Sequence, residues 1–220
     1  MPAITRDMSK TVTILMGVLN GARWLHPQLN SIAEQDHEAW VIRFSDDGST
    51  DLSVDIIAGF SEQHPDRVHR GTGPKSGFGD NYMQLIRDLP KQAGYTAFAD
   101  QDDIWIRDKL GRAVGALARS GEKPALYCGR RWLWYPKMDR RIKSPQPSRE
   151  FGFRNALIEN VAAGNTVMLN PAAARLARQA ARFWRRITVV GRPWPRRLIP
   201  PALAKVRRGT TCWPSTVLGR

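Results

Sequence analysis

The residues best suited to chemistry are three carboxylates that follow a short apolar run at residues 95–99. Asp100, Asp102 and Asp103 fall within four positions. Carboxylates this close repel one another, so they stay ionised together only where positive charge compensates them. A divalent cation that carries substrate phosphates is a usual partner for such a group. An acidic turn that caps a helix beginning near Trp105 explains the same spacing equally well.

A second acidic pair follows the apolar residues 40–44, which predict a strand. Asp46 and Asp47 then lie at the carboxyl end of that strand, which is the edge of an open α/β sheet where ligands bind. A carboxylate there accepts hydrogen bonds from a nucleobase imide or from ribose hydroxyls. We therefore assign Asp46 and Asp47 to a nucleotide, and Asp51 to capping of the next helix.

The glycine-rich loop at residues 71–81 does not match a phosphate-binding P-loop. In a P-loop, glycine comes directly before the lysine and the hydroxyl residue, whereas here Lys75 and Ser76 precede Gly77. Two interpretations of Lys75 remain open: it approaches a diphosphate, or it is a solvated loop lysine.

The elements that must position these residues alternate between strand and helix patterns. The nearly continuous apolar run at residues 12–19 predicts a strand buried on both faces of a parallel sheet. Apolar residues at helical spacing follow it up to Gln35. Further strands are predicted at residues 68–70, 95–99, 125–128 and 132–135, further helices at 54–60, 105–119, 151–160 and 171–181, and a loop at 137–149. This alternation predicts an α/β fold with a mostly parallel central sheet.

Length and composition favour one intracellular domain. The 220 residues suffice for one well-packed α/β domain. No run of about 18 apolar residues exists, and the N-terminus lacks the apolar core of a signal peptide, so we expect a cytoplasmic protein. Cys128 and Cys212 are far apart in the sequence and fit neither a disulfide framework nor a zinc site.

The formal charge of +14 is concentrated at the C-terminal end. Residues 1–159 hold 22 Lys and Arg against 20 Asp and Glu, whereas residues 160–220 hold 12 basic residues and no acidic one. The first part has an ordinary globular composition. The second part is a basic segment rich in Arg, Pro and Trp.

Three motifs in order resemble family 2 glycosyltransferases, especially bacterial rhamnosyltransferase-like members that make surface polysaccharide. Residues 100–105, Asp-Gln-Asp-Asp-Ile-Trp, resemble the family's metal-binding acidic motif. Residues 45–51 resemble its nucleotide-binding loop, and residues 12–21 its first strand and turn. The resemblance covers about residues 11–181 and implies the GT-A fold, a Rossmann-like three-layer α/β/α arrangement.

The resemblance implies transfer of a sugar from a nucleoside diphosphate sugar to a hydroxyl of a glycan or lipid-linked oligosaccharide, with inversion at the anomeric carbon. It implies Mg²⁺ or Mn²⁺ as the cofactor. By this resemblance, Asp102 and Asp103 are expected to bind the ion. The residues expected to bind the donor are Asp46, Asp47, Lys75, Asn81 and Asp100.

An inverting enzyme of this family is expected to carry a further carboxylate, often Asp before Trp, that deprotonates the acceptor hydroxyl. Residues 189–194 read Val-Val-Gly-Arg-Pro-Trp instead, and no Asp or Glu follows Glu159. Among Asp139, Glu150 and Glu159, we rank Glu159 first as the candidate base, because it flanks residues 163–170, which resemble a glycine-led strand of the family.

Residues 182–220 depart from the family pattern, and several interpretations stay open. We expect this segment to be irregular in structure, and its composition suggests an aberrant C-terminus from a frameshift or truncation. Alternatively, the basic, Trp-containing segment lies on anionic lipid at the inner membrane face. A nucleotide-sugar-binding protein without turnover is a further alternative. Nucleic-acid binding fits less well, because the first 159 residues are nearly neutral and carry no known recognition motif.

Overall fold

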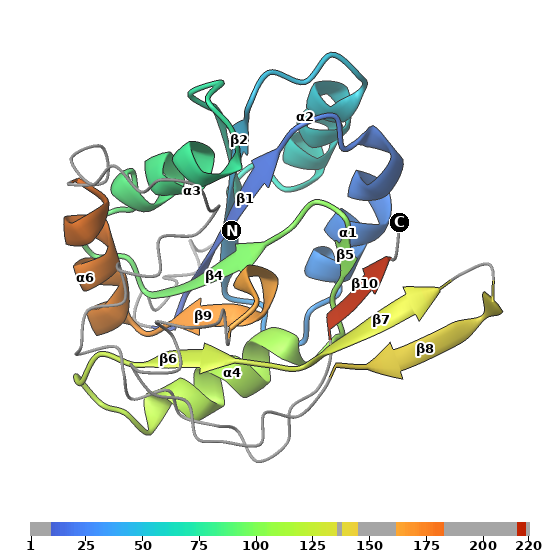
Figure 1. The fold of residues 1–220 in the computed structure, drawn as a ribbon. Coiled ribbons are helices and arrows are strands. Elements are labelled where there is room, and N and C mark those ends of the chain that lie inside the picture. Colours follow the sequence, from blue (N-terminus) through green and yellow to red (C-terminus); the bar gives the residue numbers. More distant parts are fainter. Residues whose placement is uncertain (1–9, 136–137, 145–161, 183–214, 219–220) are drawn as a thin grey trace, which may run out of the picture.

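The computed structural model describes residues 10–135, 138–144, 162–182 and 215–218, which build an α/β fold around one central sheet (Figure 1). Six strands form this sheet in the order β3-β2-β1-β4-β9-β6. Their bounds are Val12–Val18 (β1), Trp40–Asp46 (β2), Val68–Thr72 (β3), Tyr95–Ala99 (β4), Leu126–Cys128 (β6) and Val167–Leu169 (β9).

The first four strands are parallel, and β9 runs antiparallel to both β4 and β6. From β1 the chain moves outward to β2 and then β3, and it returns to place β4 on the other side of β1. The strand order therefore reverses between β1 and β4. In open α/β sheets, this switch point at the carboxyl ends of the strands is where a ligand crevice forms.

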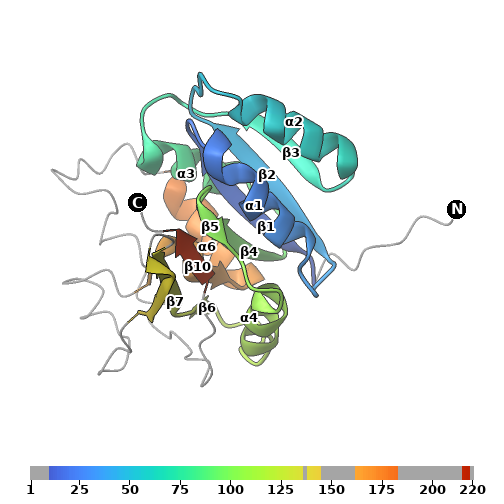
Figure 2. The ribbon, with the colours of Figure 1, turned by 90° about the vertical axis from the view of Figure 1, so that its right-hand side faces the viewer.

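Helices cover both faces of the sheet, which confirms the predicted three-layer arrangement (Figure 2). Alternation along β1 explains the two layers, since Ile14 and Met16 belong to one buried cluster and Leu15 to the other. The first cluster includes α1, α2 and α4, and the second includes α3 and α6. The helices span Ala22–Ala33 (α1), Ser53–Gln63 (α2), Phe78–Arg87 (α3), Lys109–Ala118 (α4) and Pro171–Ala181 (α6).

A second sheet has the order β5-β10-β7-β8. Its strands span Asp103–Ile104 (β5), Arg131–Tyr135 (β7), Arg140–Lys143 (β8) and Ser215–Leu218 (β10). Within residues 182–220, which we expected to be irregular, the structure describes Arg182 and β10.

Two predictions of local structure were wrong. The helix expected from residue 105 begins at Lys109, and the preceding Asp103 and Ile104 form a short strand that pairs with β10. The loop expected at residues 137–149 contains β8, which pairs with β7 over four residues. The basic residues of β8 hid this strand, since β8 is exposed and shows no apolar alternation.

Some expectations fall outside the described residues. The predicted helix at residues 151–160 and the candidate base Glu159 both lie there. Among the residues that are described, no helix is long and apolar enough to cross a membrane.

Candidate active site

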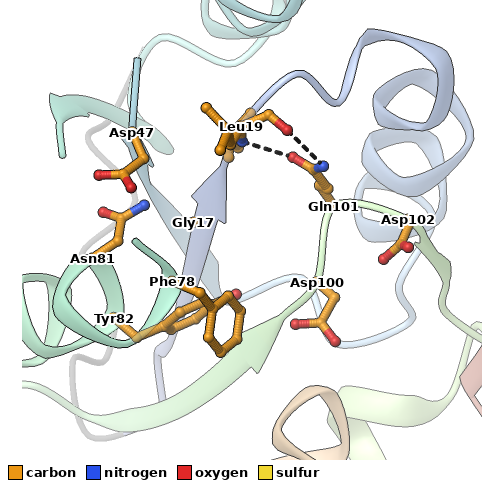
Figure 3. Close-up of a pocket in the computed structure, with 10 residues that line it drawn as sticks. Gly17, Leu19, Asp47, Phe78, Asn81, Tyr82, Asp100, Gln101 and Asp102 are labelled. Atoms are coloured by element: carbon orange, nitrogen blue, oxygen red, sulfur yellow. Dashed lines mark hydrogen bonds between the residues drawn. The ribbon is translucent and has the colours of Figure 1, made fainter. Parts of the chain in front are cut away.

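A pocket of about 360 Å³ opens at the switch point, between the carboxyl ends of β1 and β4 (Figure 3). Asp47 and Asn81 lie on one side of it, and Asp100 and Asp102 lie on the other. The two acidic segments predicted from the sequence therefore share one cavity. Its lining consists of Gly17, Val18, Leu19, Asp47, Phe78, Asn81, Tyr82, Asp100, Gln101 and Asp102.

Asp47 organises the glycine-rich loop. Its Oδ1 accepts a hydrogen bond from the Lys75 backbone N–H at 2.7 Å, and its Oδ2 accepts one from the Gly77 N–H at 3.0 Å. The Gly77 backbone has φ +97°, a conformation that favours glycine. The loop therefore folds onto the end of β2 and brings the start of α3 to the pocket.

Asn81 is buried on α3 and reaches back to the sheet. Its Nδ2 donates to the Ser45 carbonyl at 2.9 Å, while its Oδ1 is buried without a hydrogen-bond partner among the described residues. A Cβ added at Gly73 would lie 2.7 Å from Asp47 Oδ1 and 2.8 Å from Asn81 Oδ1. Only a glycine at position 73 leaves these two oxygens undisturbed.

Two residues predicted to contact the donor do not line the pocket. Asp46 Oδ2 accepts hydrogen bonds from the Gly48 and Ser49 N–H groups at 3.1 and 3.0 Å, so this carboxylate fixes the turn after β2. The Lys75 side chain passes close to Gly48. A direct role of Asp46 or Lys75 in donor binding stays a prediction.

Asp51 has the capping role that the sequence predicted, and it serves two helices. Its Oδ1 accepts from the Ser53 N–H at the start of α2, at 2.9 Å. Its Oδ2 accepts from the Ala22 N–H at the start of α1, at 3.0 Å. Hydrogen bonds to the ionised form, led by the one that the Ser53 hydroxyl donates to Oδ1, lower the pKa of this carboxyl.

At the β4 end of the pocket, Asp100 and Asp102 present two carboxylates. Burial raises the pKa of Asp100, and the neighbouring charge of Asp102 raises it further. Beneath them, the Tyr82 hydroxyl donates to the Ala99 carbonyl at 2.5 Å. Negative charge in this part of the pocket therefore favours a cationic ligand.

Asp103 does not line the pocket but is fully buried next to it. Its Oδ2 accepts a hydrogen bond from Asn165 Nδ2 at 2.7 Å. Lys109 donates from Nζ to the Asn165 carbonyl at 2.6 Å and lies 4.0 Å above the Trp105 ring. Burial raises the pKa of Asp103 to about 7 and lowers that of Lys109 to about 8. The structure thus places Asp103 in a buried network, although the sequence suggested a metal ligand.

Gln101 and Phe78 are among the lining residues that sequence reasoning missed. Gln101 spans the switch point, because its Oε1 accepts from the Leu19 N–H at 2.9 Å and its Nε2 donates to the Leu19 carbonyl at 3.0 Å (Figure 3). Phe78 begins α3, is 49% exposed, and its ring centroid lies 4.6 Å from that of Tyr82. The position of Gln101 inside the acidic motif was the available signal, whereas nothing in the sequence distinguished Phe78 from a core residue.

The side chains present fit a divalent ion shared with a substrate. Within the described part of the chain, no group of three or more His, Cys, Asp or Glu side chains could hold a metal by itself. Mg²⁺ sites often use one or two carboxylates and complete the coordination shell with substrate phosphates and water. Asp100 and Asp102 supply two such carboxylates on one wall of the pocket.

Comparison of the sequence with known proteins gives partial matches to curated transferases. The chain is 36% identical over 105 residues to the dTDP-rhamnosyl transferase RfbG of Shigella flexneri. This match covers 46% of this chain and 36% of that protein. It is 28% identical over 104 residues to the putative teichuronic acid biosynthesis glycosyltransferase TuaG of Bacillus subtilis, covering 47% of this chain and 40% of that protein. The matches thus span well under half of these relatives.

The fold resembles solved transferase structures. TarS 1-349 of S. aureus superposes with a TM-score of 0.53 at 15% identity, over 74% of this chain and 47% of that one. The mannosyltransferase PcManGT of Pyrobaculum calidifontis, in complex with GDP-Man and Mn²⁺, gives a TM-score of 0.52 at 18% identity, over 73% of this chain and 44% of that one. These likenesses support the GT-A fold.

The family comparison covers most of the chain. The profile described as Glycosyl transferase family 2 matches residues 13–195, which include every residue that lines the pocket and extend past residue 181, where the motif resemblance ended. The chain therefore belongs to glycosyltransferase family 2.

Proposed function

We propose that this chain transfers a sugar from a nucleoside diphosphate sugar to a hydroxyl of a glycan, with inversion at the anomeric carbon, in surface polysaccharide biosynthesis. The observation that carries this proposal is the shared pocket, where hydrogen-bonding groups from β2 and α3 face a pair of carboxylates after β4. A nucleotide end and a diphosphate end need these two kinds of group at opposite sides of one cavity.

The nucleoside lies against Asp47, Asn81 and Phe78. Asn81 Oδ1 is a buried acceptor without a partner among the described residues, and such an atom gains from an N–H or O–H donor on the ligand. The half-exposed ring of Phe78 offers an apolar face to a base or a sugar. Asp46 acts on the same end by fixing the turn that carries Asp47.

The diphosphate lies at the other end, where Asp102 and Asp100 hold Mg²⁺ or Mn²⁺. When bound, the ion stabilises the negative charge that develops on the leaving diphosphate. Asp103 supports this segment from below through its hydrogen bond with Asn165. We keep Glu159 as the proposed base that removes the proton of the acceptor hydroxyl.

The relatives support the donor class and the pathway. One is named a dTDP-rhamnosyl transferase, and another, from Rhizobium meliloti, a succinoglycan biosynthesis protein. TarS was solved with UDP and with UDP-GlcNAc. Because these names include several nucleotides and sugars, our proposal specifies a nucleoside diphosphate sugar and leaves the sugar to experiment. The acceptor that we propose is a glycan or a lipid-linked oligosaccharide.

Turnover tests the proposal. The full chain is incubated with Mn²⁺ and in turn with dTDP-rhamnose, UDP-GlcNAc and GDP-mannose, and release of the nucleoside diphosphate is measured with and without glycan acceptors. We expect release from one donor, stimulated by an acceptor and lost in Glu159→Gln with donor binding retained. Binding of a donor without any turnover would instead support the non-catalytic alternative, and no binding of any donor would refute both.

A further inference from the structure

The two-stranded hairpin β7–β8 is basic and carries tryptophans. Figure 1 shows that it extends away from the central sheet and its helices. β7 is half-buried along its length, and all four residues of β8 are exposed. The strands contain four cationic residues and no acidic one, namely Arg131, Arg140, Arg141 and Lys143.

The pairing of the strands places cations beside tryptophans on one face. Lys143 lies opposite Trp132, and Arg141 lies opposite Trp134, two residues further along β7. Because side chains alternate along a strand, these four residues share one face of the hairpin. The Lys143 Nζ lies 5.6 Å from the Trp132 ring centroid, and the Arg141 Cζ lies 5.5 Å from that of Trp134. The face is therefore a ladder of two cation–aromatic pairs.

The hairpin also carries two exposed apolar side chains, one in the connection between its strands and one opposite Leu133 on β8. Met138 lies between the two strands in the sequence and is 64% exposed, and Ile142 on β8 is 37% exposed. Asp139 is the one acidic residue next to β8 in the sequence. The hairpin thus combines exposed apolar side chains with an excess of positive charge.

We propose that the hairpin β7–β8 is a docking surface for an anionic lipid bilayer. Lys and Arg near such a surface are attracted by its negative potential. Tryptophan favours the boundary between headgroups and hydrocarbon, where its ring is partly apolar and its N–H stays polar. An exposed methionine at the tip reaches into the same boundary. Nucleic acid would also attract the cations, but it offers no apolar layer for the exposed Met138.

The topology gives this contact a consequence for the reaction. β5, which contains Asp103 of the acidic segment, belongs to the same sheet as the hairpin. Docking of the hairpin therefore holds the acidic segment at a fixed distance from the lipid surface. The consequence, though not the lipid contact, rests on the proposed function, since it suits a lipid-linked acceptor.

Vesicle binding tests the lipid contact without any donor or acceptor. The full chain is sedimented with vesicles of phosphatidylcholine alone or of equimolar phosphatidylcholine and phosphatidylglycerol. The variant combines Arg140→Gln, Arg141→Gln and Lys143→Gln. The control combines Lys91→Gln, Arg119→Gln and Lys123→Gln, three exposed cations elsewhere on the chain.

We expect binding to the anionic vesicles only. At roughly fivefold for each cation near the surface, the hairpin variant should bind about a hundredfold more weakly, and the control variant should bind close to wild type. Equal weakening of the two variants would overturn the proposal, because net charge alone would then explain the binding. Hairpin-dependent binding of an oligonucleotide that is tighter than binding to vesicles would overturn it as well.

A fluorescent label keeps the test decisive if the triple variant does not fold. An environment-sensitive dye is attached at Met138→Cys, with Leu52→Cys as the control position, both with Cys128 and Cys212 replaced by Ala. Leu52 is 65% exposed at the start of α2. We expect a blue shift with anionic vesicles for the label at position 138 only. No shift at position 138, or the same shift at both positions, would refute docking through the hairpin.

Discussion

The link between Gln101 and Leu19 predicts a strong coupling between Gln101 and Gly21. A Cβ added at Gly21 would lie 2.5 Å from Gln101 Oε1 and 2.6 Å from its Cδ. Gly21→Ala must therefore displace the Gln101 amide from its two hydrogen bonds with Leu19. At about 0.5–1.5 kcal/mol for each of the two bonds, we expect Gly21→Ala to destabilise the chain by about 1–3 kcal/mol.

In a Gln101→Ala background the added methyl group has room. There the same Gly21→Ala change should cost almost nothing or stabilise by a few tenths of a kcal/mol, since alanine restricts the unfolded chain at a φ of −100° that it readily adopts. The double-mutant cycle should then show a coupling of about 1–3 kcal/mol.

Urea denaturation of the four proteins measures this cycle. Gly59→Ala on α2 is the matched control, because a Cβ there meets nothing within 4 Å, and it should show no coupling with Gln101→Ala. If the costs of Gly21→Ala and Gln101→Ala simply add, Gln101 does not hold the end of β1 as the geometry indicates. In that case the switch-point pocket depends on other contacts.

Two further predictions concern the ends of the pocket. Gly73→Ala should weaken nucleotide binding, because its Cβ would displace Asp47 Oδ1 or Asn81 Oδ1, and it should cost about 1–3 kcal/mol of stability. Calorimetric titration measures the nucleotide affinity. An unchanged affinity would show that Asp47 and Asn81 do not bind the nucleotide. The second prediction uses Asp103, whose pKa burial raises from 3.8 to about 7. Between these values the native carboxyl keeps a proton that the unfolded chain has lost, so its contribution to stability falls as pH rises. The side chain at position 103 of the Asp103→Asn variant is an amide and does not titrate. The free energy of unfolding of this variant minus that of wild type should therefore increase between about pH 4 and pH 7. A difference that does not change with pH would contradict the assigned burial.

The carboxyl ends of the strands could be predicted from the sequence because apolar runs and acidic residues follow one another directly. The run at residues 12–19 and the run before Asp100 both form parallel strands of the central sheet. Since parallel strands end at one edge, Asp47 and Asp102 were expected to meet there, and both line the pocket.

The contacts between distant segments could not be predicted in the same way. Asp103 and Asn165 are 62 positions apart, and Gln101 and Leu19 are 82 apart. No local pattern reports such pairs, because they depend on how β4 and its neighbours pack. The same limit applies to β8, whose pairing partner β7, rather than its own composition, makes it a strand.

Metal-dependent nucleotide binding tests most directly whether Asp102 holds an ion on a diphosphate. The affinity of the full chain for UDP, dTDP and GDP is measured by calorimetry with and without Mn²⁺, for wild type, Asp102→Asn and the control Asp55→Asn on α2. We predict that Mn²⁺ tightens binding of one nucleotide in wild type and in Asp55→Asn, and that Asp102→Asn loses this gain while retaining the metal-independent affinity. If Asp102→Asn keeps the full effect of Mn²⁺, the pocket at the switch point does not bind a diphosphate through this carboxylate, and the proposed mechanism is wrong.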